Sequence, residues 1–236
     1  MIVNLKICND TIQKKYQFFK PTTKYIITPQ GYYQANDPRK PNKPGYPNIM
    51  ITERIIIDEC VYSIRRHLLT FTQTDDTIRT LIHNMVYKLV KKYNKKYLIN
   101  HGILIGGEMY LYGKILNEFF THKTYISDTE SIVLDSKRND PNRLNSIFKY
   151  VNYNTFKYTI KIKEPILAVC NVSKIGLGLN LCEQISIAKP KILLSIWCSY
   201  KALEKDYVTL KKSYNIIHIF RYNTNYEVFL GVLESK

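Results

Sequence analysis

The clearest pattern in this chain is the stretch Pro165–Asp206, which reads PILAVCNVSKIGLGLNLCEQISIAKPKILLSIWCSYKALEKD. It contains two short apolar runs, Ile166–Cys170 and Ile192–Trp197, and each run ends in a polar turn. Between the runs, the pattern of Leu179–Ala188 favours a helix. We therefore predict the order strand, turn, helix, strand, turn, helix. In α/β domains of this kind the functional residues lie at the carboxyl ends of the strands.

Outside this stretch, further apolar runs alternate with helical patterns. The chain is therefore expected to form an α/β domain with a doubly wound, Rossmann-like sheet of seven strands, mostly parallel with an antiparallel last strand. The remaining predicted strands are His101–Gly107, Tyr125–Asp128, Phe156–Ile162, Tyr214–Arg221 and Glu227–Leu233, with a short β-type run at Tyr25–Thr28. The remaining predicted helices are Ile49–Leu69, Thr77–Tyr93, Glu108–Phe120 and Ser131–Asn142.

The amino-terminal part has a different character from the rest. The segment Asp37–Asn48, DPRKPNKPGYPN, holds four prolines and several basic residues, which predicts a loop. We therefore divide the chain into an amino-terminal extension with a basic loop, residues 1–48, and a main domain, residues 49–236. The basic loop is either a surface linker or a mobile segment beside a binding cleft.

The composition is that of a basic globular protein. Of the 236 residues, 45% are hydrophobic, and the formal net charge is +16. This charge favours nucleic acid as a partner, although a lysine-rich codon composition would also produce it. The five cysteines have no CxxC spacing, so neither a disulfide framework nor a metal site is predicted. No apolar run has the ~20 residues needed to span a bilayer, and we expect a protein of the cytoplasm that does not bind membranes.

Two candidate cofactor-binding features follow neighbouring strands. The glycine turn IGGEMYLYG places Gly106 and Gly107 where backbone N–H groups can approach a ligand, but paired glycines also form tight turns that bind nothing. Asp128 ends the next strand about 20 residues later, which is the separation at which an acid binds ribose hydroxyls in dinucleotide folds. An aspartate at this position is also a common helix cap.

The opening stretch and the last strand supply the other candidates. The first strand of the stretch is followed by Asn171, Ser173 and Lys174. These residues either line a pocket for a cofactor or a base, or belong to an ordinary loop. Cys198 follows the second strand just before a helix, where a nucleophilic thiol is favoured, although most single cysteines are small buried hydrophobes. Glu227 begins the last strand. It is either a general base or an acid exposed to solvent.

Taken in order, these segments resemble the catalytic domain of the RNA uracil-5-methyltransferases. GYYQAN at Gly31–Asn36 is similar to the family motif S-F-x-Q-x-N, whose glutamine, here Gln34, contacts the cofactor. CNVSKIGLG at Cys170–Gly178 resembles N-P-P-R-x-G-L. The resemblance runs from about Gly31 to Leu233.

Two further motifs carry the chemistry of the family. SIWCSYKALEKDY at Ser195–Tyr207 resembles Y-I-S-C-N-P-x-T-L-x-R-D-L, in which the cysteine, here Cys198, is the nucleophile. FRYNTNYE at Phe220–Glu227 resembles F-P-x-T-x-H-V-E, in which the glutamate, here Glu227, is the general base. The family's acid–x–x–C–G–x–G cofactor turn is replaced here by the glycine turn IGGEMYLYG.

The resemblance implies an S-adenosylmethionine-dependent transferase that modifies RNA, acting on carbon 5 of a pyrimidine through a cysteine adduct. Its catalytic residues would be Cys198 and Glu227, and Lys174 and Ser173 would bind the substrate. The implied cofactor-binding residues are Gln34, Gly106, Gly107, Asp128 and Asn171. The sequence leaves two alternatives open. One is a catalytically degenerate, methyltransferase-like RNA-binding module or accessory subunit, and the other is a methyltransferase acting at a ribose or cap without Cys198.

Overall fold

A computed structural model describes residues 50–67, 70, 76–159, 165–172, 175–223 and 227–236, together with the backbone of 25–28 and 31–34. The proposed substrate residues Ser173 and Lys174 lie outside the described residues, as does the basic loop at 37–48. The division of the chain at residue 48 therefore remains a prediction.

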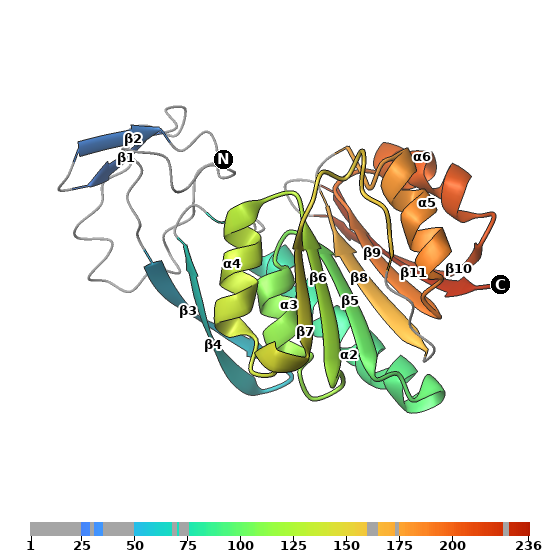
Figure 1. Ribbon diagram of the computed structural model, residues 1–236, viewed down its shortest axis with the longest axis horizontal. Coiled ribbons are helices and arrows are strands. Elements are labelled where there is room, and N and C mark those ends of the chain that lie inside the picture. The colour runs from blue at the N-terminus through green and yellow to red at the C-terminus, as the bar shows by residue number, and fades with distance from the viewer. Residues whose placement is uncertain are drawn as a thin grey trace.

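The centre of the protein is a seven-stranded sheet with the order β10-β11-β9-β8-β5-β6-β7 (Figure 1). The strands β7, β6, β5, β8 and β9 pair in parallel, whereas β11 is antiparallel to both β9 and β10. The predicted sheet, mostly parallel with an antiparallel last strand, is confirmed. The strands are β5 (His101–Gly106), β6 (His122–Ser127), β7 (Ser146–Tyr150), β8 (Ile166–Asn171), β9 (Ile192–Trp197), β10 (Tyr214–Asn223) and β11 (Glu227–Ser235).

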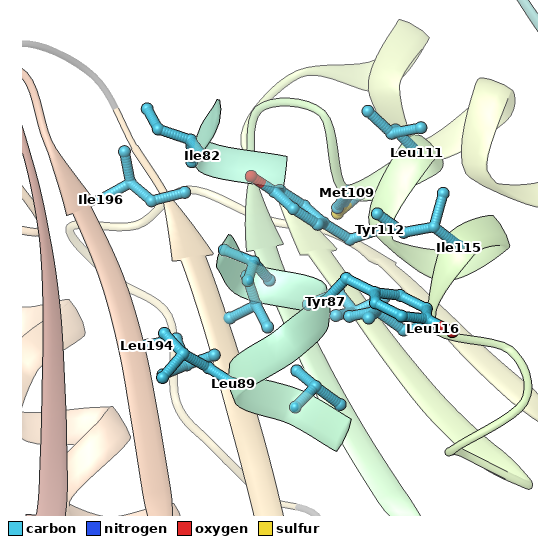
Figure 2. Packing of buried hydrophobic residues seen from close by; sticks show 14 of the residues in the cluster. Ile82, Tyr87, Leu89, Met109, Leu111, Tyr112, Ile115, Leu116, Leu194 and Ile196 are labelled. Carbon is cyan, nitrogen blue, oxygen red and sulfur yellow. The ribbon is translucent and has the colours of Figure 1, made fainter. Parts of the chain in front are cut away.

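Helices cover both faces of the sheet because the central strands are apolar on both sides. Along β5, Leu104 points into one buried cluster while Ile103 and Ile105 point into the other. The first cluster joins the sheet to α2, α3 and α4, and Figure 2 shows Ile82 of α2 near Ile196 of β9. The second cluster joins the sheet to α5 and α6. The helices are α2 (Asp76–Tyr97), α3 (Met109–Ile115), α4 (Glu130–Asn139), α5 (Leu179–Ala188) and α6 (Tyr200–Leu210), with a 3₁₀ turn η2 (Arg143–Asn145).

The helix predicted over Ile49–Leu69 is wrong, because this segment forms a β-hairpin of β3 (Met50–Ile57) and β4 (Cys60–His67). Asp58 and Glu59 form the turn with φ of 49° and 69°, the left-handed values that a two-residue hairpin needs. Isoleucines at this spacing fit either periodicity, and their branched Cβ atoms favour strands. Alternation is clear at Ile56, which is 61% exposed between two buried isoleucines.

The predicted strand at Phe156–Ile162 is also wrong in its described part, since residues 156–159 have no regular structure. The third strand of the parallel side is β7, which precedes this segment and was not predicted. It is an edge strand of mixed burial, so its sequence lacks a continuous apolar run. Phe156 instead packs into the second buried cluster. The short strand at Tyr25–Thr28 is confirmed as β1, paired with β2 (Gly31–Gln34).

Candidate active site

The carboxyl ends of β5 and β8 lie side by side in the middle of the sheet. Gly106 at the end of β5 is level with Asn171 at the end of β8. The chain then leaves β5 for α3, which belongs to the first buried cluster, and leaves β8 for α5, which belongs to the second. Ligands of open α/β sheets bind in the crevice where the connections diverge in this way. The predicted site residues Gly106, Gly107 and Asn171 are therefore brought together at this point.

The turn after β5 is held tightly against the end of β8. Gly106 has a φ of +90°, and a Cβ at this position would lie 2.2 Å from the Asn171 carbonyl oxygen. The Gly107 N–H donates to the same carbonyl at 2.5 Å. Only glycine fits the first position, because both the backbone conformation and the available space exclude a side chain.

Glu108, the residue after the two glycines, is a site residue that the sequence did not reveal. It has a left-handed φ of 57° as the N-cap of α3, which costs a non-glycine residue roughly 1–2 kcal/mol. Its carboxylate is only 1% exposed, and it accepts a hydrogen bond from Arg79 Nε at 2.6 Å and another from Asn171 Nδ2 at 3.4 Å. His83 Nε2 lies 3.2 Å from Glu108 Oε2, the oxygen that also accepts from Asn171. The one local signal is an acid directly following the glycine pair.

A buried ion-pair network continues from Glu108 into the β3–β4 hairpin. Arg79 also donates to Glu53, and Arg66 Nε donates to Glu53 Oε2 at 3.0 Å. Burial by itself would raise the pKa of the Glu53 carboxyl, but the hydrogen bonds and charges of Arg79 and Arg66 lower it overall. Two carboxylates are thus balanced by two guanidinium groups. The network fixes Glu108, and through it the Asn171 amide, to α2 and the hairpin.

Asp128 lies at the end of β6 with its side chain exposed. The N-cap position of α4 belongs to Thr129, whose hydroxyl donates to Asp128 Oδ1 at 3.3 Å. The Asp128 carboxylate therefore keeps acceptor positions open to solvent at the same edge of the sheet as Gly106. Beside it, burial raises the pKa of the Tyr153 phenol, and the charge of Asp128 raises it further.

Cys198 differs from the two cysteines buried in the second cluster. It is half-buried and directly follows β9, whereas Cys170 and Cys182 lie inside the core. Burial raises the pKa of both core thiols well above the usual range, so they are inert as nucleophiles. Ser199 caps α6 by accepting the Ala202 N–H at 3.2 Å, which places Cys198 one residue before a helix amino terminus.

Glu227 begins β11 at the same edge of the sheet. Phe229 is level with Trp197 in the antiparallel β9–β11 pair, so continuing the register by two residues brings Glu227 level with Ser199. The Glu227 carboxylate forms an ion pair with Arg221 of β10, and both side chains are more than a third exposed. Gln34 ends β2, and its side chain lies outside the described part of the chain.

Among the residues described, no cluster of three or more histidine, cysteine or acidic side chains could hold a metal ion. The same part of the chain contains no helix whose length and hydropathy would let it cross a bilayer.

Comparison with solved structures identifies the fold. The tRNA (uracil-54, C5)-methyltransferase of Pyrococcus abyssi, in complex with S-adenosyl-L-homocysteine, superposes with a TM-score of 0.51 and 18% identity over 77% of this chain and 44% of that one. The N-methyltransferase NodS of Bradyrhizobium japonicum WM9 has a TM-score of 0.51 and 8% identity over 64% of this chain and 94% of that one. No family model and no curated protein matches the sequence.

The chain therefore shares the Rossmann-like fold of these two methyltransferases. It spans less than half of the length of the Pyrococcus protein. The topology of the sheet agrees with this fold.

Proposed function

We propose that the protein is an S-adenosylmethionine-dependent methyltransferase that acts on RNA. The observation that carries the proposal is the juxtaposition of the Gly106–Gly107 turn with the end of β8, beside the exposed Asp128. Ligands of open α/β sheets bind beyond the carboxyl ends of the strands, where this turn lies. An exposed carboxylate one strand away suits the two hydroxyls of a ribose.

These residues fit the cofactor by their chemistry. Asp128 would accept hydrogen bonds from the ribose of S-adenosylmethionine. The turn at Gly106 and Gly107 would face the remainder of the cofactor. Asn171 donates its amide N–H to Glu108, which leaves its side-chain oxygen as an acceptor for a cofactor or base. The family motif also implies that Gln34 contacts the cofactor. Ser173 and Lys174 are proposed to bind the substrate on the same ground. When bound, S-adenosylmethionine supplies an electrophilic methyl group.

For the reaction itself we propose methylation at carbon 5 of a pyrimidine. The Cys198 thiolate would add to carbon 6 of the base, and carbon 5 would then be nucleophilic enough to accept the methyl group, with S-adenosyl-L-homocysteine as the leaving group. Glu227 then removes the proton from carbon 5, and the bond from sulfur to carbon 6 breaks. The helix dipole of α6 favours negative charge near Cys198. The Arg221–Glu227 pair is exposed, so it is worth ~0–1 kcal/mol and can open readily.

The base must be reached outside a stack, so the target nucleotide is flipped out or single-stranded. The net charge of +16 suits the phosphates of such a substrate.

A non-catalytic, methyltransferase-like RNA-binding module is the second candidate. The observation that favours it is the closed turn after β5. The Gly107 N–H is already used by the Asn171 carbonyl, and Glu108 is held in a neutralised buried network. This arrangement leaves fewer backbone donors for a ligand than an open glycine loop would.

Titration calorimetry with S-adenosyl-L-homocysteine separates the two candidates. Wild type is expected to bind, and Asp128→Ala is expected to bind roughly 10–100-fold more weakly, because a hydrogen bond to a charged group is worth ~1.5–3 kcal/mol. Glu130→Ala tests the neighbouring exposed acid, and Glu204→Ala on α6 is the remote control. No heat from wild type, alongside clear RNA binding, selects the non-catalytic module.

Trapping with RNA that contains 5-fluorouridine tests the cysteine mechanism. Wild type is expected to form a covalent adduct and Cys198→Ala none. Cys60→Ala should form as much as wild type, because Cys60 is an exposed thiol beside the turn of the β3–β4 hairpin, outside the central sheet. An equal yield of adduct from wild type and Cys198→Ala contradicts the mechanism. Full methyl transfer by Cys198→Ala selects a methyltransferase acting elsewhere on the nucleotide.

A further inference from the structure

The carboxyl-terminal half of α2 carries a lysine stripe, formed by Lys88, Lys91, Lys92, Lys95 and Lys96, all of them exposed. Their spacing of three, one, three and one residues places them on one face of the helix, within an arc of about 140° at ~3.6 residues per turn. The opposite face is buried, and Figure 2 shows Leu89 facing Leu194 of the sheet. The stripe is therefore the solvent side of α2.

The positive charge of the stripe is largely unbalanced. After Asp76, α2 contains no acidic residue. Among the described residues, Lys91 Nζ lies 3.4 Å from Asp58 and Lys96 Nζ lies 3.9 Å from Glu234. No acidic partner within the same part of the chain is found for the other three: Lys88, Lys92 and Lys95.

Helix stability does not explain this arrangement. Lysines in the last turn are favourable at the negative end of the helix dipole, which accounts for Lys95 and Lys96. Lys88 and Lys92, however, are four residues apart, and like charges at this spacing destabilise a helix. A solvated helix face usually alternates acids with bases, and this one does not.

Tyrosine rings beneath the stripe hold several of the lysines in place. Lys92 Nζ lies 5.4 Å from the ring centre of Tyr93, and Lys96 Nζ lies 4.6 Å from that of Tyr97. Lys191, from the turn before β9, reaches the same Tyr97 ring at 5.2 Å. Such cation–π contacts restrict the long side chains before any ligand arrives, so less entropy is lost on binding.

We propose that the lysine stripe is a track for the phosphate backbone of the nucleic acid, an inference that rests on the proposed function for the identity of that partner. Because Tyr97 is followed after three residues by β5, this end of α2 lies at the amino edge of the sheet. Arg79 and His83, nearer the start of α2, contact Glu108 at the carboxyl edge. The stripe thus leads away from the candidate site.

The dimensions fit a short run of phosphates. Lys88 lies five residues beyond His83, or about 8 Å along the helix axis, and the stripe itself extends over about 12 Å. One strand of a duplex advances ~3.4 Å per phosphate, so the stripe matches about three phosphates. A lipid surface fits less well, because α2 has its apolar face in the core and nothing to insert into a membrane.

The test compares two triple variants with the same change in charge. Lys88→Gln/Lys92→Gln/Lys95→Gln removes the unbalanced lysines of the stripe, and Lys201→Gln/Lys205→Gln/Lys212→Gln removes three exposed lysines on and after α6. Fluorescence anisotropy measures the binding of a labelled single-stranded RNA and a labelled RNA hairpin over a range of salt concentrations. Circular dichroism and thermal melting confirm that both variants are folded.

For the stripe variant, the slope of log affinity against log salt is expected to decrease by about 2 on the single strand, because three phosphate contacts are lost at ~0.7 each. Affinity near 0.1 M salt should decrease roughly 10–100-fold, while the α6 variant changes it less than about threefold. Lys→Arg at the same three stripe positions should restore binding. Equal losses of RNA affinity in both triple variants, or no loss of RNA affinity in the stripe variant, would overturn the inference.

Two further measurements keep this inference distinct from the proposed function. If the stripe variant binds RNA as tightly as wild type does, and cofactor binding and methyl transfer are also unchanged, the proposed function is kept and the phosphate track is rejected. If wild type does not bind the cofactor but the stripe variant binds RNA more weakly than wild type, the phosphate track is kept and the methyltransferase function is rejected. A stripe effect on binding to phosphatidylserine vesicles but not to RNA overturns the inference in favour of a lipid surface.

Discussion

The two ends of α2 carry basic side chains in opposite situations. Near its start, Arg79 is buried and paired with two carboxylates, Glu53 and Glu108. Toward its end, Lys88, Lys92 and Lys95 are exposed, without an acidic partner among the described residues. The first end holds a site in shape, and the second presents charge to solvent. Residue type alone therefore does not assign a role to a basic residue on this helix.

The largest expected effect comes from breaking the buried end. Arg79→Met should destabilise the fold by about 3–5 kcal/mol, because it leaves Glu53 and Glu108 short of a partner in the core. Urea unfolding measures the change. Arg221→Met breaks an exposed ion pair instead and should cost less than about 1 kcal/mol. Similar losses from the two variants would mean that the network is not structurally important.

The glycine turn held by this network is the second target. Gly106→Ala should cost roughly 2–4 kcal/mol and remove S-adenosyl-L-homocysteine binding, because its Cβ meets the Asn171 carbonyl at 2.2 Å in a left-handed conformation. Gly178→Ala has a similar positive φ, +80°, but its Cβ meets no atom within 4 Å. It should show only the backbone strain, about 1–3 kcal/mol, and retain binding. Binding retained by Gly106→Ala would place the cofactor elsewhere.

His101, just beyond the lysine end of α2, should make the stability of the fold sensitive to acid. Burial, helped by the charge of His122, lowers the pKa of His101 from 6.5 to about 4. Between these two pH values the unfolded chain binds a proton at His101 that the folded chain does not. The contribution of neutral His101 to the free energy of unfolding is therefore complete above pH 6.5 and is lost as pH falls toward 4. The loss of stability should be about 3 kcal/mol.

Urea unfolding of wild type and His101→Gln across this range of pH provides the measurement. The variant cannot titrate at this position and should lose correspondingly less stability. The Glu53 carboxyl has a lowered pKa, so its own contribution is lost at still lower pH in both proteins. Parallel curves for the two proteins would contradict the assignment to His101.

The smallest expected effect separates stability from binding at the lysine end. Lys92→Glu places an acid four residues from both Lys88 and Lys96, which should stabilise α2 by about 0.5–1 kcal/mol. The same change should weaken RNA binding, because it reverses a charge within the stripe. A thermal melt and an anisotropy titration of one sample test both halves. Tighter RNA binding by this variant would show that the stripe faces another partner.

Much of the central sheet could be predicted from the sequence because its signals are local. The six-residue run Ile192–Trp197 and the segment Leu179–Ala188 are observed as β9 and α5 with the predicted bounds. Buried parallel strands read as continuous apolar runs, and the turns between them require glycine or polar residues. The half-exposed edge strand β7 and the β3–β4 hairpin have no such unbroken run, and both were missed.

The candidate site was predictable only in its strand-end residues. Gly106, Gly107, Asp128, Asn171 and Cys198 lie at strand ends that the order of elements already places at one edge. Glu108, Arg79 and Glu53 come together over separations of 26 and 29 residues, and no local pattern reports such a pairing. Local sequence patterns predicted the order β8, α5, β9, α6 and fixed the spacing of the lysines on α2. Which basic residues are neutralised depends on the distant acids that the fold brings within reach, and no local pattern reports this.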